Sequence, residues 1–228
     1  MLVSARVLVI VALSFIAANV HALDPPYSEL KQSISVEQRS VRRAGRRLRR
    51  GRAKPLERLL LGRIDALSRA WLGTRWGLGM PQTQSPGVGK VNCGLFVALV
   101  LKHAGFNLPI WKFNRQAARD AILSVAPRKY VRYFHRAPMP RFIADVKRMG
   151  PGLFLIGLDF HIGFLRLDKA GRLRFIHASY VTKKVVDEPA DRAVPIVKSR
   201  YRLVGKILQP NMLRSWLSGR RIHIRGSR

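Results

Sequence analysis

A single cysteine, Cys93, stands where the residue pattern predicts that a helix begins. Asn92 is of a type that caps helix N-termini, an apolar helical face follows over residues 96–101, and Gly105 ends it. A helix N-terminus carries free N–H groups and about half a positive charge, which stabilises a thiolate. We therefore predict that Cys93 is a nucleophile of lowered pKa whose backbone N–H faces an oxyanion of acyl transfer. The alternatives are a buried cysteine that packs as a small apolar side chain and a cysteine in an intermolecular disulfide.

A base for this thiol is predicted from two histidines on neighbouring strands. His161 and His177 lie in predicted strands that residues 169–171 join as a hairpin, and facing side chains of such strands lie within about 5 Å. One histidine can accept the thiol proton while the other orients it through the second ring nitrogen. Each could instead only hydrogen-bond within the sheet. Asp159, two residues before His161, is an alternative orienting group or a turn residue.

Four short motifs occur in a fixed order along the chain: GTRWGLG at 73–79, NCGLFV at 92–97, HIG at 161–163 and FIHAS at 175–179. This order resembles the NlpC family of papain-like cell-wall peptidases over residues 56–185. The resemblance implies an α+β, papain-like domain in which the nucleophile begins a helix packed on an antiparallel sheet. It also implies that Cys93 is the nucleophile, His161 the general base and His177 the residue that orients His161.

The sequence departs from the pattern of that family around the nucleophile. Trp76 stands where the family usually has a tyrosine, Asn92 replaces a common aspartate, and Gly94 with Leu95 replaces the usual Ser-Gly. Trp76, Asn92 and Gly94 are therefore tentative substrate or oxyanion residues, and an indole N–H can only donate. These departures do not change the expected type of reaction, but they leave open whether the substrate is the usual one of that family.

The first 22 residues have the pattern of a secretory signal. A lone Arg6 precedes an uncharged apolar run over residues 7–20, and a small-x-small cleavage pattern ends at Ala22. The apolar run is shorter than the ~20 residues that span a bilayer, so no transmembrane span is expected in the mature chain. We predict a periplasmic or secreted protein, for which nucleic acid is not an expected partner.

The chain has a formal net charge of +31, which favours anionic polymers and surfaces as partners. Residues 39–52 contain eight arginines and no acidic residue. They belong to residues 23–54, interpreted as a basic, flexible arm that is either an amphipathic helix on an anionic surface or a disordered segment. The arginines expected to bind an anionic surface are Arg39, Arg42, Arg43, Arg46, Arg47, Arg49, Arg50 and Arg52.

The remaining pattern predicts helices before strands, which is an α+β layout. A catalytic domain is expected over residues 55–210, followed by a short helix and a basic tail over residues 211–228. The predicted helices begin at Pro55 and Asn92 and cover residues 114–124, 140–149 and 212–217. The predicted strands cover residues 153–158, 161–167, 173–177 and 201–208.

Three functions remain open from the sequence. The leading hypothesis is hydrolysis of an amide bond in a bacterial cell-envelope peptide of the peptidoglycan type, through a thioester at Cys93. The second is an acyl- or lipid-directed reaction of the same thiol, and the third is a cationic envelope-binding protein without catalysis. No metal or other cofactor is implied, because one cysteine and histidines 16 residues apart give no zinc-ligand spacing.

Overall fold

The computed structural model describes residues 26–45 and 51–226. The predicted signal segment lies outside these residues, and so do Arg46, Arg47, Arg49 and Arg50. The α-helices are α1 (Tyr27–Arg43), α2 (Ala53–Ala70), α3 (Cys93–His103), α4 (Ile110–Asn114), α5 (Ala118–Val125), α6 (Met139–Arg148), α7 (Val194–Lys198) and α8 (Pro210–Ser218), with a 3₁₀ turn, η1 (Arg128–Tyr130).

The strands form one mixed sheet in the order β2-β1-β7-β6-β5-β4-β8-β3. They are β1 (Arg75–Trp76), β2 (Lys90–Val91), β3 (Val131–His135), β4 (Gly152–Leu158), β5 (Ile162–Leu167), β6 (Leu173–Ser179), β7 (Lys184–Pro189) and β8 (Tyr201–Lys206). Among the described strands, β1 and β2 pair in parallel and the other neighbours are antiparallel. The predicted α+β class is confirmed, and the prediction of a purely antiparallel sheet was wrong at this edge.

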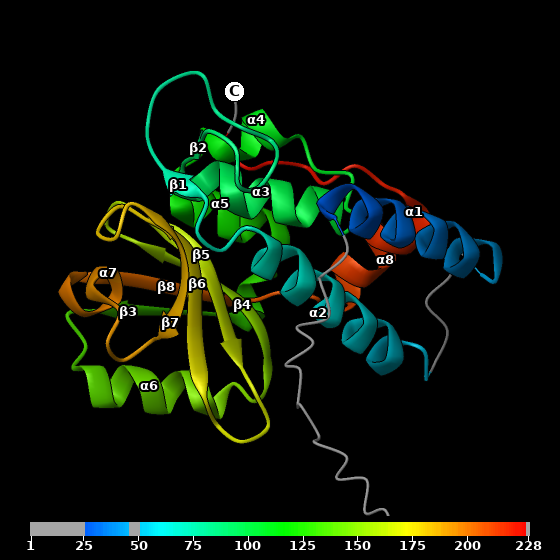
Figure 1. Cartoon of the computed structure of the whole chain (residues 1–228). Coiled ribbons are helices and arrows are strands. Elements are labelled where there is room, and N and C mark those ends of the chain that lie inside the picture. Colours follow the sequence, from blue (N-terminus) through cyan, green and yellow to red (C-terminus); the bar gives the residue numbers. More distant parts are fainter. Residues whose placement is uncertain (1–25, 46–50, 227–228) are drawn as a thin grey trace, which may run out of the picture.

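Helices cover both faces of the sheet (Figure 1). α3 and α5 pack on one face, where α3 meets β5 and β6 and α5 meets β4 and β8. α6 lies on the other face and places Phe142 and Val146 in a second apolar cluster. Strand alternation sends Ile176 and Ala178 of β6 to the first face and Phe175 to the second.

α3 is surrounded by other elements, which explains its composition. Every residue from Gly94 to Leu101 is buried, so the helix is apolar all round rather than along one stripe. α2 and α4 also pack against it. The first turn of α3 therefore has a fixed position relative to the start of β5, which positions Cys93.

The N-terminal segment is part of the folded domain, which corrects the prediction of a flexible arm. α1 packs against α2 and α8, and its Ile34 is only 2% exposed within the main core. Gln38 donates to the carbonyl of Gly105 over 2.7 Å, and Arg42 donates to the carbonyl of Trp216. The folded domain thus begins near Tyr27 and not at Pro55, because one buried apolar side chain and several hydrogen bonds hold a helix that is otherwise strongly charged.

The C-terminal segment also packs on the core. After α8, Ile222 and Ile224 are buried while the residues between and beside them face outward. The N–H of Ile222 donates to the carbonyl of Asn107 over 2.9 Å. The basic residues of this tail are therefore held at defined positions on the surface.

Candidate active site

Cys93 is the first residue of α3, as predicted, and Asn92 caps the helix. The Oδ1 atom of Asn92 accepts a hydrogen bond from the N–H of Leu95 over 2.8 Å. The N–H of Asn92 in turn donates to Oε1 of Gln82 over 2.8 Å. These bonds satisfy a free donor of the helix N-terminus and fix the backbone on either side of Cys93.

Cys93 and His161 line the same pocket, which has a cavity volume of about 360 Å³. Asn92 and Gly94 line it too, so the structure brings together four of the six predicted site residues. The pocket lies between the first turn of α3, the α4–α5 region and the loop that joins β4 to β5. Its other lining residues are Leu78, Phe113, Asn114, Gln116, Ala117, Ala118, Ala121, Leu158, Asp159, Phe160 and Ile162.

Gly94 has a steric role beside Cys93. A Cβ atom at this position would lie 2.6 Å from Oδ1 of Asn114 and 3.1 Å from the Asn114 carbonyl oxygen. Glycine therefore allows the end of α4 to approach the first turn of α3 and brings the Asn114 amide into the pocket wall. The sequence pattern did not predict Asn114, because its place depends on the packing of α4 against α3.

His161, His177 and Glu188 form a hydrogen-bonded chain that leads away from the pocket. Nε2 of His161 lies 2.7 Å from Nδ1 of His177, and Nε2 of His177 lies 2.8 Å from Oε1 of Glu188. Both histidines are buried, whereas the Glu188 side chain is 28% exposed. The predicted contact between the two histidines is confirmed, and the chain has a third member on β7.

Sheet geometry explains how these three side chains meet. β5 and β6 form the predicted hairpin, and β6 pairs with β7 so that Phe175 is opposite Glu188 and His177 opposite Val186. Glu188 is therefore the diagonal neighbour of His177 on the same face of the sheet. The Phe175 ring stacks on the His177 ring at 3.9 Å between centroids, which limits the orientations available to that imidazole.

The position of Glu188 determines the tautomer of each histidine. As a carboxylate, Glu188 can only accept, so Nε2 of His177 carries the proton and donates. Neutral His177 then has an unprotonated Nδ1, which accepts the N–H at Nε2 of His161. The unprotonated nitrogen of His161 is consequently Nδ1. This leaves Nδ1 as the basic atom of His161, in a residue that lines the pocket with Cys93.

Burial keeps His161 and His177 neutral. It lowers the pKa of His161 to about 3, with a further contribution from the neighbouring His177. It also lowers the pKa of His177, although the hydrogen bond to Glu188 acts in the opposite direction. Burial raises the pKa of the Cys93 thiol, and the backbone N–H groups of Ile162, Gly94 and Cys93 itself only partly offset this.

The predicted lowering of the Cys93 pKa was therefore wrong. Position at the N-terminus of a helix does supply hydrogen-bond donors to the sulfur, as expected, but loss of solvent contact has the larger effect. The resting site contains a neutral thiol and a neutral imidazole rather than a thiolate–imidazolium pair.

Trp76 does not line this pocket. Its ring lies 6.4 Å from that of Tyr180, and the Tyr180 ring lies 5.4 Å from that of His161, measured between centroids. Among the described residues, Nε1 of Trp76 is buried and has no hydrogen-bond partner. Tyr180, which follows β6 directly, and Phe175 of β6 are the aromatic residues whose rings lie edge-on to that of His161. The motif that suggested Trp76 gave no signal for Tyr180.

Asp159 is a turn residue, not an orienting group for His161. Its carboxylate accepts hydrogen bonds from the backbone N–H groups of Arg200 and Tyr201 over 2.9 and 3.0 Å. Its own N–H donates to Oγ of Ser199. These bonds tie the loop between β4 and β5 to the start of β8, which holds Phe160 and His161 in place.

A larger cavity, of about 980 Å³, lies on the other side of α5. Arg119, Arg128, Arg220, Arg221 and Arg225 line it, but Cys93 and the histidine pair do not. We therefore assign the chemistry to the smaller pocket. Within residues 26–45 and 51–226, no three His, Cys, Asp or Glu side chains are grouped so that they could hold a metal ion. No helix in the same residues is long and apolar enough to cross a membrane.

Comparison of this chain with protein-family models, with curated proteins and with solved structures gives no match. The site is accordingly interpreted from its own residues and geometry.

Proposed function

We propose that this protein is an exported cysteine hydrolase that cleaves an amide bond of a cell-envelope peptide through a thioester at Cys93. One observation supports this proposal most strongly. Cys93 shares a pocket with His161, and the bonds through His177 to Glu188 leave the Nδ1 atom of His161 unprotonated. A nucleophile, a base and groups that orient the base are the three parts that acyl transfer requires.

In the proposed reaction, Sγ of Cys93 attacks the carbonyl carbon while its proton passes to Nδ1 of His161. The backbone N–H groups at the start of α3 are suited to hold the oxyanion. The proton then passes from His161 to the leaving amine, and the acyl group remains on sulfur as a thioester. Water, activated by the same imidazole, hydrolyses the thioester and restores the thiol.

The hydrogen-bonded chain has its largest effect when His161 becomes charged. Burial disfavours the imidazolium, as the low pKa of His161 indicates. During attack, His177 accepts the Nε2–H bond of this cation and the Glu188 carboxylate lies behind it. The charge is therefore stabilised in the transition state more than in the neutral resting state, which is the requirement for catalysis.

A second candidate is an acyl- or lipid-directed reaction of the same thiol. The observation that favours it is Phe160, which lines the pocket mouth and is 95% exposed. An apolar residue at this position suits an acyl chain better than a strongly polar peptide.

The proposal is tested by incubating the mature protein with muropeptides and, separately, with phospholipid and thioester substrates. We expect release of an amine from the muropeptides by wild type and none by Cys93→Ala, with a covalent acyl-enzyme detected by mass spectrometry of the intact protein. Acylation by lipid esters alone would support the second candidate. Turnover that survives in Cys93→Ala would contradict both.

Glu188→Gln tests the role of the orienting chain. The substitution keeps the size of the side chain but removes its negative charge, so we expect kcat to fall by about 10- to 100-fold with little change in KM. Asp187→Asn, which removes the neighbouring charge paired with Arg174, is the matched control. If Glu188→Gln and wild type had the same kcat, the hydrogen-bonded chain of His161, His177 and Glu188 would have no role in the reaction.

A further inference from the structure

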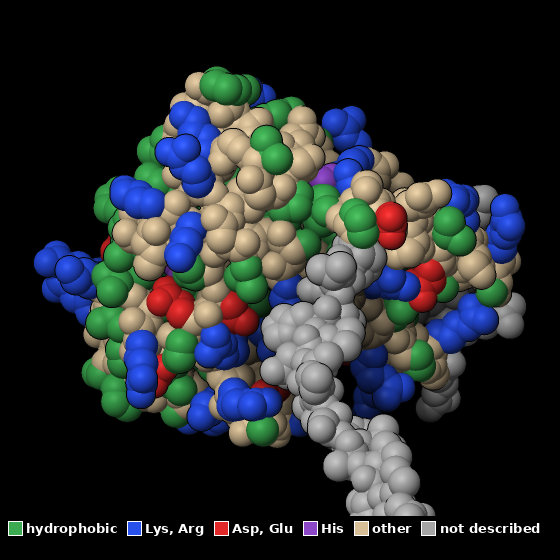
Figure 2. Space-filling model, viewed as in Figure 1, with side chains coloured by type: hydrophobic (Ala, Val, Ile, Leu, Met, Phe, Trp, Pro, Cys, Tyr) green, Lys and Arg blue, Asp and Glu red, His purple; other side chains and the backbone are tan. Residues whose placement is uncertain are grey.

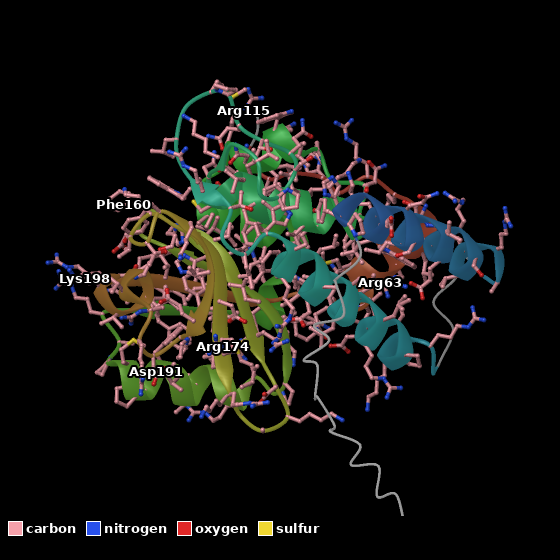
Figure 3. The ribbon with its side chains drawn as sticks, viewed as in Figure 1. Arg63, Arg115, Phe160, Arg174, Asp191 and Lys198 are labelled. Carbon is pink, nitrogen blue, oxygen red and sulfur yellow. The ribbon has the colours of Figure 1, made fainter. Side chains whose placement is uncertain are left out.

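The pocket mouth carries an unusually exposed aromatic residue. Phe160 lies in the loop between β4 and β5, directly before His161, and is 95% exposed. It points outward at the left of the molecule, as Lys198 does, and Arg115 lies at the top (Figure 3). The hydrogen bonds of Asp159 fix this loop, so the exposed position of Phe160 belongs to a defined backbone.

A second loop presents apolar side chains beside the same pocket. Residues 77–89 join β1 to β2, and their loop projects beyond the neighbouring helices (Figure 1). Leu78 lines the pocket and is 66% exposed, and Met80 and Val88 are about equally exposed. We call these four residues, Leu78, Met80, Val88 and Phe160, the apolar rim. Leu78 and Phe160 line the same pocket, and exposed apolar side chains at a pocket and on the loop beside it mark an interaction surface.

Cationic residues lie next to the apolar rim. Lys90 ends the 77–89 loop and pairs with Arg75 across β1 and β2. Arg115 lies between two residues that line the pocket, and the N–H of Arg200 binds Asp159 beside Phe160. In Figure 2 the part of the surface over the 77–89 loop carries apolar, Lys and Arg side chains together.

Acidic residues are missing from the same part of the chain. The sequence contains no Asp or Glu between Asp65 and Asp120, a stretch that includes the 77–89 loop, the start of α3 and all of α4. Asp159 is the one carboxylate that lines the pocket, and two backbone N–H groups bind it. The region around the apolar rim is therefore complementary to a surface in which a layer of anionic groups covers an apolar layer.

We propose that the apolar rim docks on an anionic phospholipid bilayer, with the pocket mouth facing the membrane. Phe160 and the 77–89 loop enter the boundary between head groups and acyl chains, and Lys90, Arg115 and Arg200 contact lipid phosphates. The proposed function enters only through the identity of the pocket, because docking itself needs no reactive thiol. Substrates attached to the membrane would then reach Cys93 without leaving the surface.

A bilayer fits these observations better than two other partners. A second copy of the chain would bring the same cations face to face in a symmetric interface, in a protein with a net charge of +31. A soluble polyanion would pair with the cations and leave Phe160 and Leu78 in water. Only an amphiphilic surface accounts for both groups of residues.

Binding is measured by vesicle sedimentation with Cys93→Ala, so that turnover cannot alter the lipids. We expect binding to vesicles of equal parts phosphatidylglycerol and phosphatidylcholine to be at least about tenfold tighter than binding to phosphatidylcholine alone. Raising the salt from ~0.05 to ~0.5 M should weaken the former, since screening shortens the reach of the charges. Equal binding by wild type and Cys93→Ala keeps this test separate from that of the hydrolase.

Substitutions locate the docking surface. Phe160→Ser and Met80→Ser should each weaken binding to the anionic vesicles by about three- to tenfold, because each removes an inserted apolar side chain. Val36→Ser is the matched control, since Val36 is 52% exposed but lies on α1, away from the pocket. Val36→Ser should bind as the parent protein does.

Charge-reversal substitutions test whether the cations near the apolar rim contribute to binding. Lys90→Glu with Arg200→Glu should weaken binding more than Lys147→Glu with Lys169→Glu, which changes the net charge equally on α6 and at the β5–β6 turn. Equal loss from both pairs, or from Phe160→Ser and Val36→Ser, would overturn the proposal in favour of diffuse attraction. A Phe160-dependent dimer in sedimentation velocity, or equal affinity for soluble polyphosphate, would overturn it in favour of the other partners.

Discussion

The hydrogen-bonded chain from His161 to Glu188 and the helix α1 are both polar segments held against an apolar core, yet the fold holds them differently. In the first, two buried imidazoles meet each other and a carboxylate, so polar contacts define the geometry. In α1, most charges face outward, Ile34 is fully buried in the core, and Tyr27, Leu30 and Val41 pack partly against it. The comparison indicates that the function of the hydrogen-bonded chain depends on the orientation of its side chains, whereas the position of α1 depends on the burial of apolar side chains.

The two regions should therefore respond to different substitutions. A substitution in the hydrogen-bonded chain should reduce the rate of catalysis and leave the free energy of unfolding nearly unchanged. A substitution in α1 should reduce the free energy of unfolding and leave the activity of folded molecules unchanged.

The largest effect is expected at the base. His161→Ala should lower kcat by at least about 1,000-fold, close to the loss in Cys93→Ala, because members of one catalytic unit are not additive. His177→Ala should reduce kcat less, since the proton acceptor remains. Steady-state kinetics on any substrate found for wild type would measure this. If His177→Ala abolished turnover and His161→Ala did not, the roles of base and orienting residue would be reversed.

Next in size is the loss of the apolar anchor of α1. Ile34→Ala should lower the free energy of unfolding by about 2–4 kcal/mol, because it removes a fully buried side chain and leaves a cavity. Val36→Ala on the exposed side of the same helix should change it by less than about 0.5 kcal/mol. Urea unfolding followed by tryptophan fluorescence would compare the two. Equal stabilities would mean that α1 does not pack on the core in solution.

Residues 27–52 therefore cannot be deleted as a separable arm. Deletion would remove Ile34 and Tyr27, and Tyr27 accepts a hydrogen bond from Nε1 of Trp71 over 2.9 Å. Because that bond occupies the oxygen of Tyr27, its hydroxyl hydrogen is free to donate to Nδ1 of His103, 2.7 Å away. This arrangement requires His103 to be neutral at Nδ1.

A smaller effect follows from the titration of His103. Burial, aided by the charges of Lys31 and Lys102, lowers the pKa of His103 from 6.5 to about 4. The unfolded chain therefore binds a proton that the folded protein does not, and stability is complete above pH 6.5 and falls as the pH drops toward 4. After allowance for solvent screening, we expect His103 to account for about 1 kcal/mol of lost stability between pH 7 and pH 5.

His103→Gln isolates that contribution, since His161 and His177 shift in the same direction and remain in both proteins. The difference in unfolding free energy between pH 7 and pH 5 should be smaller in the variant than in wild type. An identical pH dependence in the two proteins would show that His103 titrates alike in both states.

Local sequence patterns were sufficient for the parts of the site that depend on neighbours in the chain. Asn92 as a cap, Cys93 as the first helical residue and the hairpin that joins β5 to β6 all follow from such patterns, and all are confirmed. Once the hairpin was expected, the two histidines on its adjacent strands were expected to lie close together.

Other features depend on contacts between distant segments. Glu188 joins the site only because β7 pairs with β6 in one register, and β7 is a largely polar strand that ends in proline. The burial of Ile34 depends on α2 and α8, while the surrounding sequence is dominated by charge. The pKa of Cys93 reverses the expected direction for the same reason, because desolvation is set by the whole fold and not by the helix that the thiol begins.

The smallest expected effect is that of His161 on the ionisation of Cys93. Burial raises the pKa of the thiol, and His161 stays neutral down to a pH of about 3, so no imidazolium is present near neutral pH to stabilise a thiolate. Removing the imidazole in His161→Asn should therefore leave the pH dependence of Cys93 alkylation by iodoacetamide nearly unchanged, while turnover is lost. In both proteins the apparent pKa of the thiol should lie above that measured for the same cysteine in urea. A thiolate–imidazolium pair would behave in the opposite way, because loss of the cation would move the alkylation curve to higher pH. His135→Asn, an exposed histidine on β3, provides the control for the substitution itself. If wild type reacted at lower pH than the unfolded chain and His161→Asn removed that difference, the site would rest as an ion pair and proton transfer would precede attack.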